Sequence, residues 1–234
     1  MIYLDSITSK TLKTLWQLRD AGLLRGFYLA GGTGLALQVG HRISDDLDFL
    51  TDQPSIEIPT GLLHAQCVKH FQGNKLGVLI KSTEQLRLAI NGVAVTFLAY
   101  PYKHKYPLLN EDGIPLADAR DIAFQKALAI GRRETARDYI DLAWILKNGI
   151  LTLDSLISGA SELFNAKEAG SFSPRLFLQQ LVCTDNLPDK EAALKQLHTH
   201  ESFDSITEEL VTVVHERSQR LLQSDPEGTN KDGS

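Results

Sequence analysis

Apolar and polar residues follow one another in the N-terminal part of the chain in patterns that define four elements in turn. Leucine and tryptophan recur at helical spacing between positions 6 and 24, which predicts an amphipathic helix. A short apolar run at 27–30 predicts a buried strand, and positions 33–39 predict a buried helix that ends at Gly40. From Asp46 to Leu50 acidic and apolar residues alternate, so a strand here would place Asp46 and Asp48 on one face.

The middle of the chain has the periodicity of strands. After a connection interrupted by prolines, a helix is predicted at 61–71, and short runs rich in Val, Ile and Leu follow at 75–81, 85–90 and 93–99. Asn91-Gly92 between the last two runs predicts a hairpin. Positions 101–115 are polar and predict a loop, whose Lys103-His104-Lys105 sequence would either bind a nucleic-acid backbone or be solvated.

From Asp118 onward the pattern is helical. A helix is predicted at 119–133, and after a turn a second helix ends at 146. Further helices are predicted at 152–165, 175–183 and 189–198. A capping box at Ser205 and Glu208 predicts the start of a last helix. The chain therefore predicts an α+β fold, in which a mixed sheet with flanking helices (1–115) precedes a helical subdomain (116–223). The tail at 224–234 lacks apolar residues and is predicted to be disordered.

Composition narrows the class of protein. The 234 residues are 43% hydrophobic with a formal charge of −5, which is typical of a globular protein and argues against nucleic-acid binding over the whole surface, although a local basic patch could hold an RNA end. No apolar run reaches membrane-spanning length and the first residues lack the pattern of a signal peptide, so a cytoplasmic protein without membrane partners is expected. Two distant cysteines indicate neither a disulfide framework nor a zinc site.

The candidate chemistry lies between Gly31 and Asp48. Two carboxylates side by side at a strand end are unfavourable unless a cation neutralises them, and Mg²⁺ is commonly held by one or two carboxylates together with substrate phosphates. Gly31-Gly32-Thr33 precedes them at a predicted helix N-terminus, where free N–H groups can bind phosphate. The alternative is an ordinary turn followed by a strand whose aspartates face water.

The combined motif resembles that of a known family. The order of Leu29-Ala30-Gly31-Gly32-Thr33, a short helix and His41-Arg42-Ile43-Ser44-x-Asp46-Leu47-Asp48-Phe49 is similar to the DNA polymerase β-like nucleotidyltransferases, and more closely to the AbiEii/AbiGii nucleotidyltransferase toxins. The resemblance implies a nucleotidyltransferase fold and assigns metal binding and catalysis to Asp46 and Asp48. It also implies nucleotide binding by Gly31, Gly32, Thr33, Arg42, Ser44 and Lys126.

A second segment resembles the same family. Asp121-Ile122-Ala123-x-x-Lys126, followed by Arg137-Asp138-x-x-Asp141-Leu142, matches motifs that supply an active-site lysine and aspartates, so the resemblance adds Lys126, Asp138 and Asp141 as catalytic candidates. The alternative is a surface ion pair between Arg137 and Asp141, with Lys126 extending from an apolar helix face to solvent.

The third carboxylate of the polymerase β superfamily has no counterpart at its expected place, where Thr96 stands, unless Asp45, Glu84 or a later acid replaces it. The leading hypothesis is a Mg²⁺-dependent (or Mn²⁺-dependent) transfer of a nucleotide from a nucleoside triphosphate to a hydroxyl of an RNA 3′ end, such as that of a tRNA, or to a hydroxyl of a protein. The resemblance implies a toxin with a cognate antitoxin, or a phage-defence protein. The alternative is a nucleotide-binding or interaction module that does not catalyse. Sugar transfer through Asp-x-Asp is disfavoured, because the glycine turn lies one short helix upstream.

Overall fold

The computed structural model describes residues 2–72, 76–130, 132–133, 135–166 and 170–224, so most of the tail predicted to be disordered lies outside the described residues. Its elements, in order, are η1 (Leu4–Ser6), α1 (Ser9–Asp20), β1 (Phe27–Leu29), α2 (Gly31–Val39), β2 (Asp46–Thr51), α3 (Thr60–His70), β3 (Leu76–Lys81), β4 (Gln85–Ile90), β5 (Val93–Leu98), β6 (Leu109–Glu111), β7 (Ile114–Leu116), α4 (Ala119–Ala129), α5 (Ala136–Lys147), α6 (Leu153–Asn165), α7 (Pro174–Leu181), α8 (Lys190–Leu194) and α9 (Phe203–Ser224).

The described strands form one mixed, seven-stranded sheet in the order β3-β4-β5-β2-β1-β7-β6. Strand β2 lies at its centre, antiparallel to β1 and parallel to β5. The hairpin β4–β5 turns at Asn91 and Gly92, whose φ angles of 53° and 76° are those that a two-residue hairpin requires. The predicted α+β class, the mixed sheet and this hairpin are therefore confirmed.

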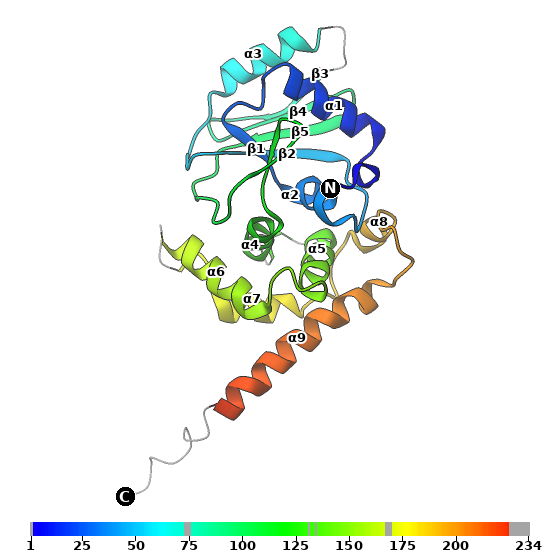
Figure 1. The fold of residues 1–234 in the computed structure, drawn as a ribbon, viewed down its shortest axis with the longest axis vertical. Helices are drawn as coiled ribbons and strands as arrows, with labels where there is room; N and C mark the ends of the chain where they lie inside the picture. Colours follow the sequence, from blue (N-terminus) through cyan, green and yellow to red (C-terminus); the bar gives the residue numbers. More distant parts are fainter. Residues whose placement is uncertain (1, 73–75, 131, 134, 167–169, 225–234) are drawn as a thin grey trace, which may run out of the picture.

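Helices cover both faces of the sheet (Figure 1). Helices α1 and α3 lie on one face, α2, α4 and α5 lie on the other, and α6, α7 and α9 pack beyond them. Two apolar clusters fill these layers, and the alternation of β2 divides its side chains between the faces. Leu47 and Phe49 are fully buried on the side of α1 and α3. Asp46 and Asp48 consequently face α4 and α5.

The segment predicted as a loop at 101–115 contains a second hairpin, β6–β7, and that part of the prediction is wrong. Its turn is Asp112-Gly113, with φ angles of 52° and 81°, and Asp-Gly is as strong a hairpin signal as Asn-Gly. Strand β7 is parallel to β1 and adds the hairpin to the sheet edge. The basic residue Lys105 of this segment pairs with Glu162 of α6.

Two helix predictions need correction. The helix predicted at 189–198 spans only Lys190–Leu194, and α9 begins at Phe203, before the predicted capping box. The Ser202 hydroxyl accepts a hydrogen bond from the Ser205 N–H (3.1 Å), so Ser202 rather than Ser205 caps the last helix. Each helix within the described ranges is too short or too polar to cross a membrane.

Candidate active site

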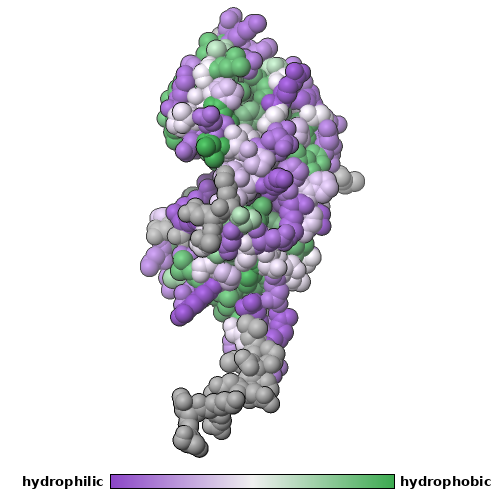
Figure 2. Space-filling view, turned by 90° about the vertical axis from the view of Figure 1, so that its left-hand side faces the viewer, coloured by the Kyte–Doolittle hydropathy of each residue, from purple (hydrophilic) through white to green (hydrophobic). Residues whose placement is uncertain are grey.

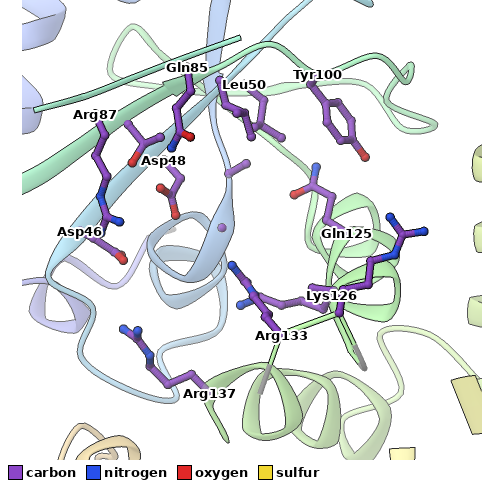
Figure 3. Close-up of a pocket in the computed structure, with 16 residues that line it drawn as sticks. Asp46, Asp48, Leu50, Gln85, Arg87, Tyr100, Gln125, Lys126, Arg133 and Arg137 are labelled. Atoms are coloured by element: carbon purple, nitrogen blue, oxygen red, sulfur yellow. The ribbon is translucent and has the colours of Figure 1, made fainter. Parts of the chain in front are cut away.

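The two carboxylates of β2 face a pocket of about 560 Å³ between the sheet and the helices α4 and α5 (Figure 3). Asp46 and Asp48 are both partly exposed to it, while Leu47 between them is fully buried. On the face shown in Figure 2, the outline of the molecule is indented where the part that contains the sheet meets the helices. The predicted convergence of the two aspartates on one strand face is thus observed.

Cationic side chains outnumber these acids in the pocket. They come from β4, from α4, from the α4–α5 connection and from the first turn of α5, and they are Arg87, Lys126, Arg132, Arg133 and Arg137. Figure 3 shows Asp46, Arg87 and Arg137 together at one end, with Lys126 and Arg133 below Asp48. A pocket with such an excess of positive charge beside two acids is suited to a polyanion that is accompanied by a metal ion.

Helix α2 begins at the edge of this pocket, and its first residue has no space for a side chain. Gly31 has φ of +61°, and a Cβ atom there would lie 2.7 Å from Asp48 Oδ2. A Cβ atom on Gly32 would lie 2.3 Å from Arg42 Nη2. The N–H groups of a first helical turn lack partners within the helix, so the missing side chains leave this donor-rich end close to Asp48.

We expect Gly31→Ala to destabilise the protein by more than Gly22→Ala. Both glycines have positive φ, and Ala in this region costs about 1–2 kcal/mol, but a Cβ on Gly22 (φ +69°) would have nothing within 4 Å. The difference between the two variants in urea-unfolding free energy therefore measures the contact of position 31 with Asp48. Equal losses in the two variants would show that Asp48 moves aside at no cost.

Behind the glycine turn, Thr33 and Ser44 connect α2 to β2. The buried Thr33 hydroxyl contacts both the Ser44 hydroxyl (2.8 Å) and the main-chain carbonyl of Asp46. The Ser44 hydroxyl lies 3.4 Å from Asp46 Oδ1. These residues fix the position of Asp46 relative to α2 and do not line the pocket.

Lys126 is held by a buried ion-pair network. Its Nζ atom lies 2.7 Å from Asp138 Oδ1 and 2.6 Å from Asp141 Oδ2. Arg42 donates to both oxygens of Asp141 at 2.7 and 3.0 Å, and His41 Nε2 lies 2.7 Å from Asp141 Oδ1. The alternative of a surface pair between Arg137 and Asp141 is therefore wrong, because Asp141 is fully buried and bound to other partners.

The residues of this network stay ionised although they are buried. Burial alone would raise the pKa of Asp141, but Arg42 and Lys126 hold it well below the ordinary value of 3.8. Burial likewise opposes the ionisation of Asp138, yet Lys126 and Arg133 lower its pKa. Burial would lower the pKa of Lys126, and the two aspartates raise it instead. Lys126 thus remains a cation, and it lies at the pocket wall.

These pKa shifts predict the acid sensitivity of the fold. Because the pKa values of Asp138 and Asp141 are lowered on folding, their ionised forms stabilise the folded protein above the ordinary value of 3.8, and this contribution is lost as the pH falls below it. We expect the midpoint of urea unfolding to decline steeply between about pH 4 and pH 2. An Asp138→Asn variant should show a shallower decline, and an unchanged slope would contradict this origin.

The pKa of Asp48 is shifted in the opposite direction to those of Asp138 and Asp141. Burial and the neighbouring Asp46 raise its pKa, and the Thr96 hydroxyl, Lys126 and Arg133 only partly offset them. Two acids in this condition fit a single divalent cation, which keeps several waters and adds substrate phosphates as ligands. Throughout the described residues, no group of three or more His, Cys, Asp or Glu side chains could hold a metal ion.

Thr96 stands beside Asp48 in the parallel register of β2 and β5, where a third acid would complete the polymerase β pattern. Its side chain lines the pocket. Asp45 and Glu84, the candidates to replace that acid, do not line the pocket.

The structure therefore divides the residues singled out from the sequence into two groups. Gly31, Asp46, Asp48 and Lys126 meet at the pocket. The others lie behind it as supports, with no place in its lining: Gly32, Thr33, Arg42, Ser44, Asp138 and Asp141. Sequence analysis missed Gln85, Arg87, Tyr100, Gln125, Arg132, Arg133 and Arg137 as lining residues. The arginines clustered just before and at the start of α5 were the one signal that could have indicated some of them.

Comparisons with known proteins agree with this geometry. The family model described as "Nucleotidyl transferase AbiEii toxin, Type IV TA system" matches residues 13–212. Uncharacterized protein aq_aa25 of Aquifex aeolicus (strain VF5) is 35% identical over 141 residues, which is 58% of this chain and 65% of that protein. The match thus spans a little less than two thirds of the length of that relative.

Solved structures share the fold. JHP933 from Helicobacter pylori is 18% identical, with a TM-score of 0.53 over 95% of this chain and 100% of that chain. MenT4, the nucleotidyltransferase toxin Rv2826c from Mycobacterium tuberculosis H37Rv, is 14% identical, with a TM-score of 0.53 over 91% of this chain and 88% of that chain. A candidate nucleotidyltransferase from H. pylori gives a TM-score of 0.57 at 18% identity over 92% of this chain and 98% of that chain.

Proposed function

Because this chain belongs to the AbiEii nucleotidyltransferase toxin family, whose model matches most of its length, we propose that it transfers a nucleotide from a nucleoside triphosphate to a hydroxyl group. The acceptor oxygen forms a bond to the α-phosphorus, the bond from that phosphorus to the β-phosphate oxygen breaks, and pyrophosphate and the hydroxyl proton are released. One observation supports this most directly: two aspartates and five cationic side chains line one pocket beside the first turn of α2.

Different residues of the pocket would bind the metal ion and the phosphates. Asp46 and Asp48 would hold one Mg²⁺ ion, with Mn²⁺ as an alternative, which would neutralise charge that develops on the phosphates. Lys126 and Arg133 bind phosphate oxygens, and the α2 N-terminus at Gly31 offers further N–H donors. Since catalysis of phosphoryl transfer is largely positioning and charge stabilisation, fixed cations at this wall are what the reaction requires.

Asp138 and Asp141 are positioning residues in this proposal. Both are buried behind Lys126, and both keep its ammonium charged and fixed in place. Arg42 and His41 hold Asp141 in turn, so two sequence segments far apart are joined behind the pocket. The reassignment leaves Asp46, Asp48 and Lys126 as the residues that touch the reactants.

The acceptor we propose is the 3′ end of an RNA such as a tRNA, with a protein side chain as the alternative. Family membership supports the setting of a type IV toxin–antitoxin system, with a cognate antitoxin as partner. Phage defence is the role that we propose for such a system. The test is to incubate the protein with each labelled triphosphate and Mg²⁺ in the presence of total RNA or of total protein. Label transferred to neither pool would overturn the proposal.

A second candidate function rests on Thr96. Without a third acid at this position the protein could bind a triphosphate and Mg²⁺ and not turn it over. Tight binding of labelled triphosphate by equilibrium dialysis, together with no release of pyrophosphate under any acceptor condition, would favour this non-catalytic module. Pyrophosphate release that depends on an acceptor would exclude it.

A further inference from the structure

The pocket has a second end, lined in part by apolar side chains, that the transfer chemistry does not use. Figure 3 shows Tyr100, Leu50 and Gln125 at this end, away from Asp46, Arg87 and Arg137. Leu50 and its partner in the parallel register, Leu98 of β5, provide an apolar wall. The Gln125 amide extends from α4 toward the cavity. A concave site with apolar walls and a few hydrogen-bonding groups is the common form of a small-molecule site.

The main chain of Tyr100 is anchored at this end. Its main-chain N–H donates to the Thr51 hydroxyl (3.1 Å), and its ring packs edge-on against Tyr102 with centroids 5.4 Å apart. The residue is only 9% exposed. Yet its hydroxyl has no hydrogen-bond partner among the described residues. A buried hydroxyl left unpaired is costly, and a small rotation of the Tyr100 side chain toward the pocket would let a ligand group satisfy it.

Gln125 connects the two ends of the pocket. It immediately precedes Lys126 on α4, and both residues line the cavity. If Lys126 and Arg133 bind the phosphates of a nucleoside triphosphate, its nucleoside can reach either end of the pocket. The end with Asp46, Arg87 and Arg137 carries charges, which a neutral nucleobase does not need, whereas the end with Leu50 and Tyr100 offers apolar contact.

We propose that the nucleobase of the substrate binds between Leu50, Leu98 and Tyr100, and that the Tyr100 hydroxyl and the Gln125 amide select it by hydrogen bonds to its edge. The inference rests on the proposed function and adds a specificity site to it. An amide and a phenol can together donate and accept hydrogen bonds, so a base whose edge has the complementary groups binds more tightly than the other three. A site built to hydrogen-bond a particular edge discriminates strongly, because the wrong base leaves its buried groups unpaired.

Binding titrations test this without knowledge of the acceptor. ATP, GTP, CTP, UTP and inorganic tripolyphosphate are titrated, each with Mg²⁺, into the wild-type protein and into Gln125→Leu and Tyr100→Phe. We expect the wild type to prefer one nucleotide by about tenfold or more. Each variant should reduce this preference to below about threefold, while the affinity for tripolyphosphate, which has no base, stays unchanged.

Gln85→Leu is the matched control. It removes the same amide from the same pocket, but from β4 on the side of Asp48, so the preference among the four nucleotides should persist. Equal affinity of the wild type for all four nucleotides, or an unchanged preference in both variants, would overturn the inference and leave the proposed function standing. Failure of the wild type to bind any triphosphate or tripolyphosphate would instead overturn the proposed function.

Discussion

Replacing either pocket aspartate, as Asp46→Asn or Asp48→Asn, should reduce nucleotide transfer by at least about 100-fold. Each change removes half of the protein charge that would hold the metal ion, and no other carboxylate lines the pocket among the described residues. The stability of the ligand-free protein should respond in the other direction. Because burial and Asp46 raise the pKa of Asp48, its ionised form is unfavourable near neutral pH, and Asn relieves this repulsion.

Thermal melts with and without Mg²⁺-triphosphate, run beside the transfer assay, measure both effects. The variants should melt at or above the wild-type temperature without ligand, and they should lose the stabilisation that Mg²⁺-triphosphate gives the wild type. Ligand stabilisation that persists in both variants would place the metal site elsewhere. A Thr96→Asp variant extends the experiment, since faster transfer than in the wild type would show that the missing acid limits catalysis.

The same chemical change at Asp141 should have a far larger effect on stability. Asp141→Asn leaves Arg42 and Lys126 buried with fewer negative partners, and breaking a buried ion pair on one side costs about 3–5 kcal/mol. Burial strengthens each of these interactions, because water cannot screen them or replace the lost carboxylate. We therefore expect the free energy of unfolding to fall by this amount in urea titrations at neutral pH.

Asp154→Asn is the control for this prediction. Asp154 also pairs with two arginines, Arg217 and Arg220, but its side chain is 53% exposed. Exposed ion pairs contribute at most about 1 kcal/mol, so this variant should unfold close to the wild type. Similar losses at positions 141 and 154 would mean that burial of the network is not what stabilises it.

The central part of the fold could be predicted because its sequence signals are local. Alternation in β2 placed Asp46 and Asp48 on one face, and Asn91-Gly92 indicated the β4–β5 hairpin. The parallel pairing of β2 with β5 is non-local, and no pattern in the sequence predicted it. The hairpin at Asp112-Gly113 was missed because its strands have three residues each, too few to show alternation.

The support behind the pocket could not be predicted from periodicity. Whether Asp141 faces solvent or the core depends on what packs against α5, and its partner Arg42 lies 99 residues away. An Arg-Asp pattern on a helix is equally compatible with a surface pair and with a buried network. The resemblance to the toxin family indicated that Lys126, Asp138 and Asp141 matter, but it did not separate the lysine that faces the pocket from the aspartates that hold it.

The two halves of the site differ in the sequence separation between the residues that must come together to form them. The acids and the glycine turn lie within one short segment, joined by Thr33 and Asp46 only 13 positions apart. Apart from Arg87 of β4, the cations meet them only when α4 and α5 dock, through contacts that span about a hundred residues. Since long loops close late and at greater entropic cost, we expect the acids to come together first during synthesis and folding. A chain still emerging from the ribosome would hold its acids in place with Arg87 but without Lys126 and Arg133 to bind a triphosphate, so we expect nucleotide binding only after the helical part is complete.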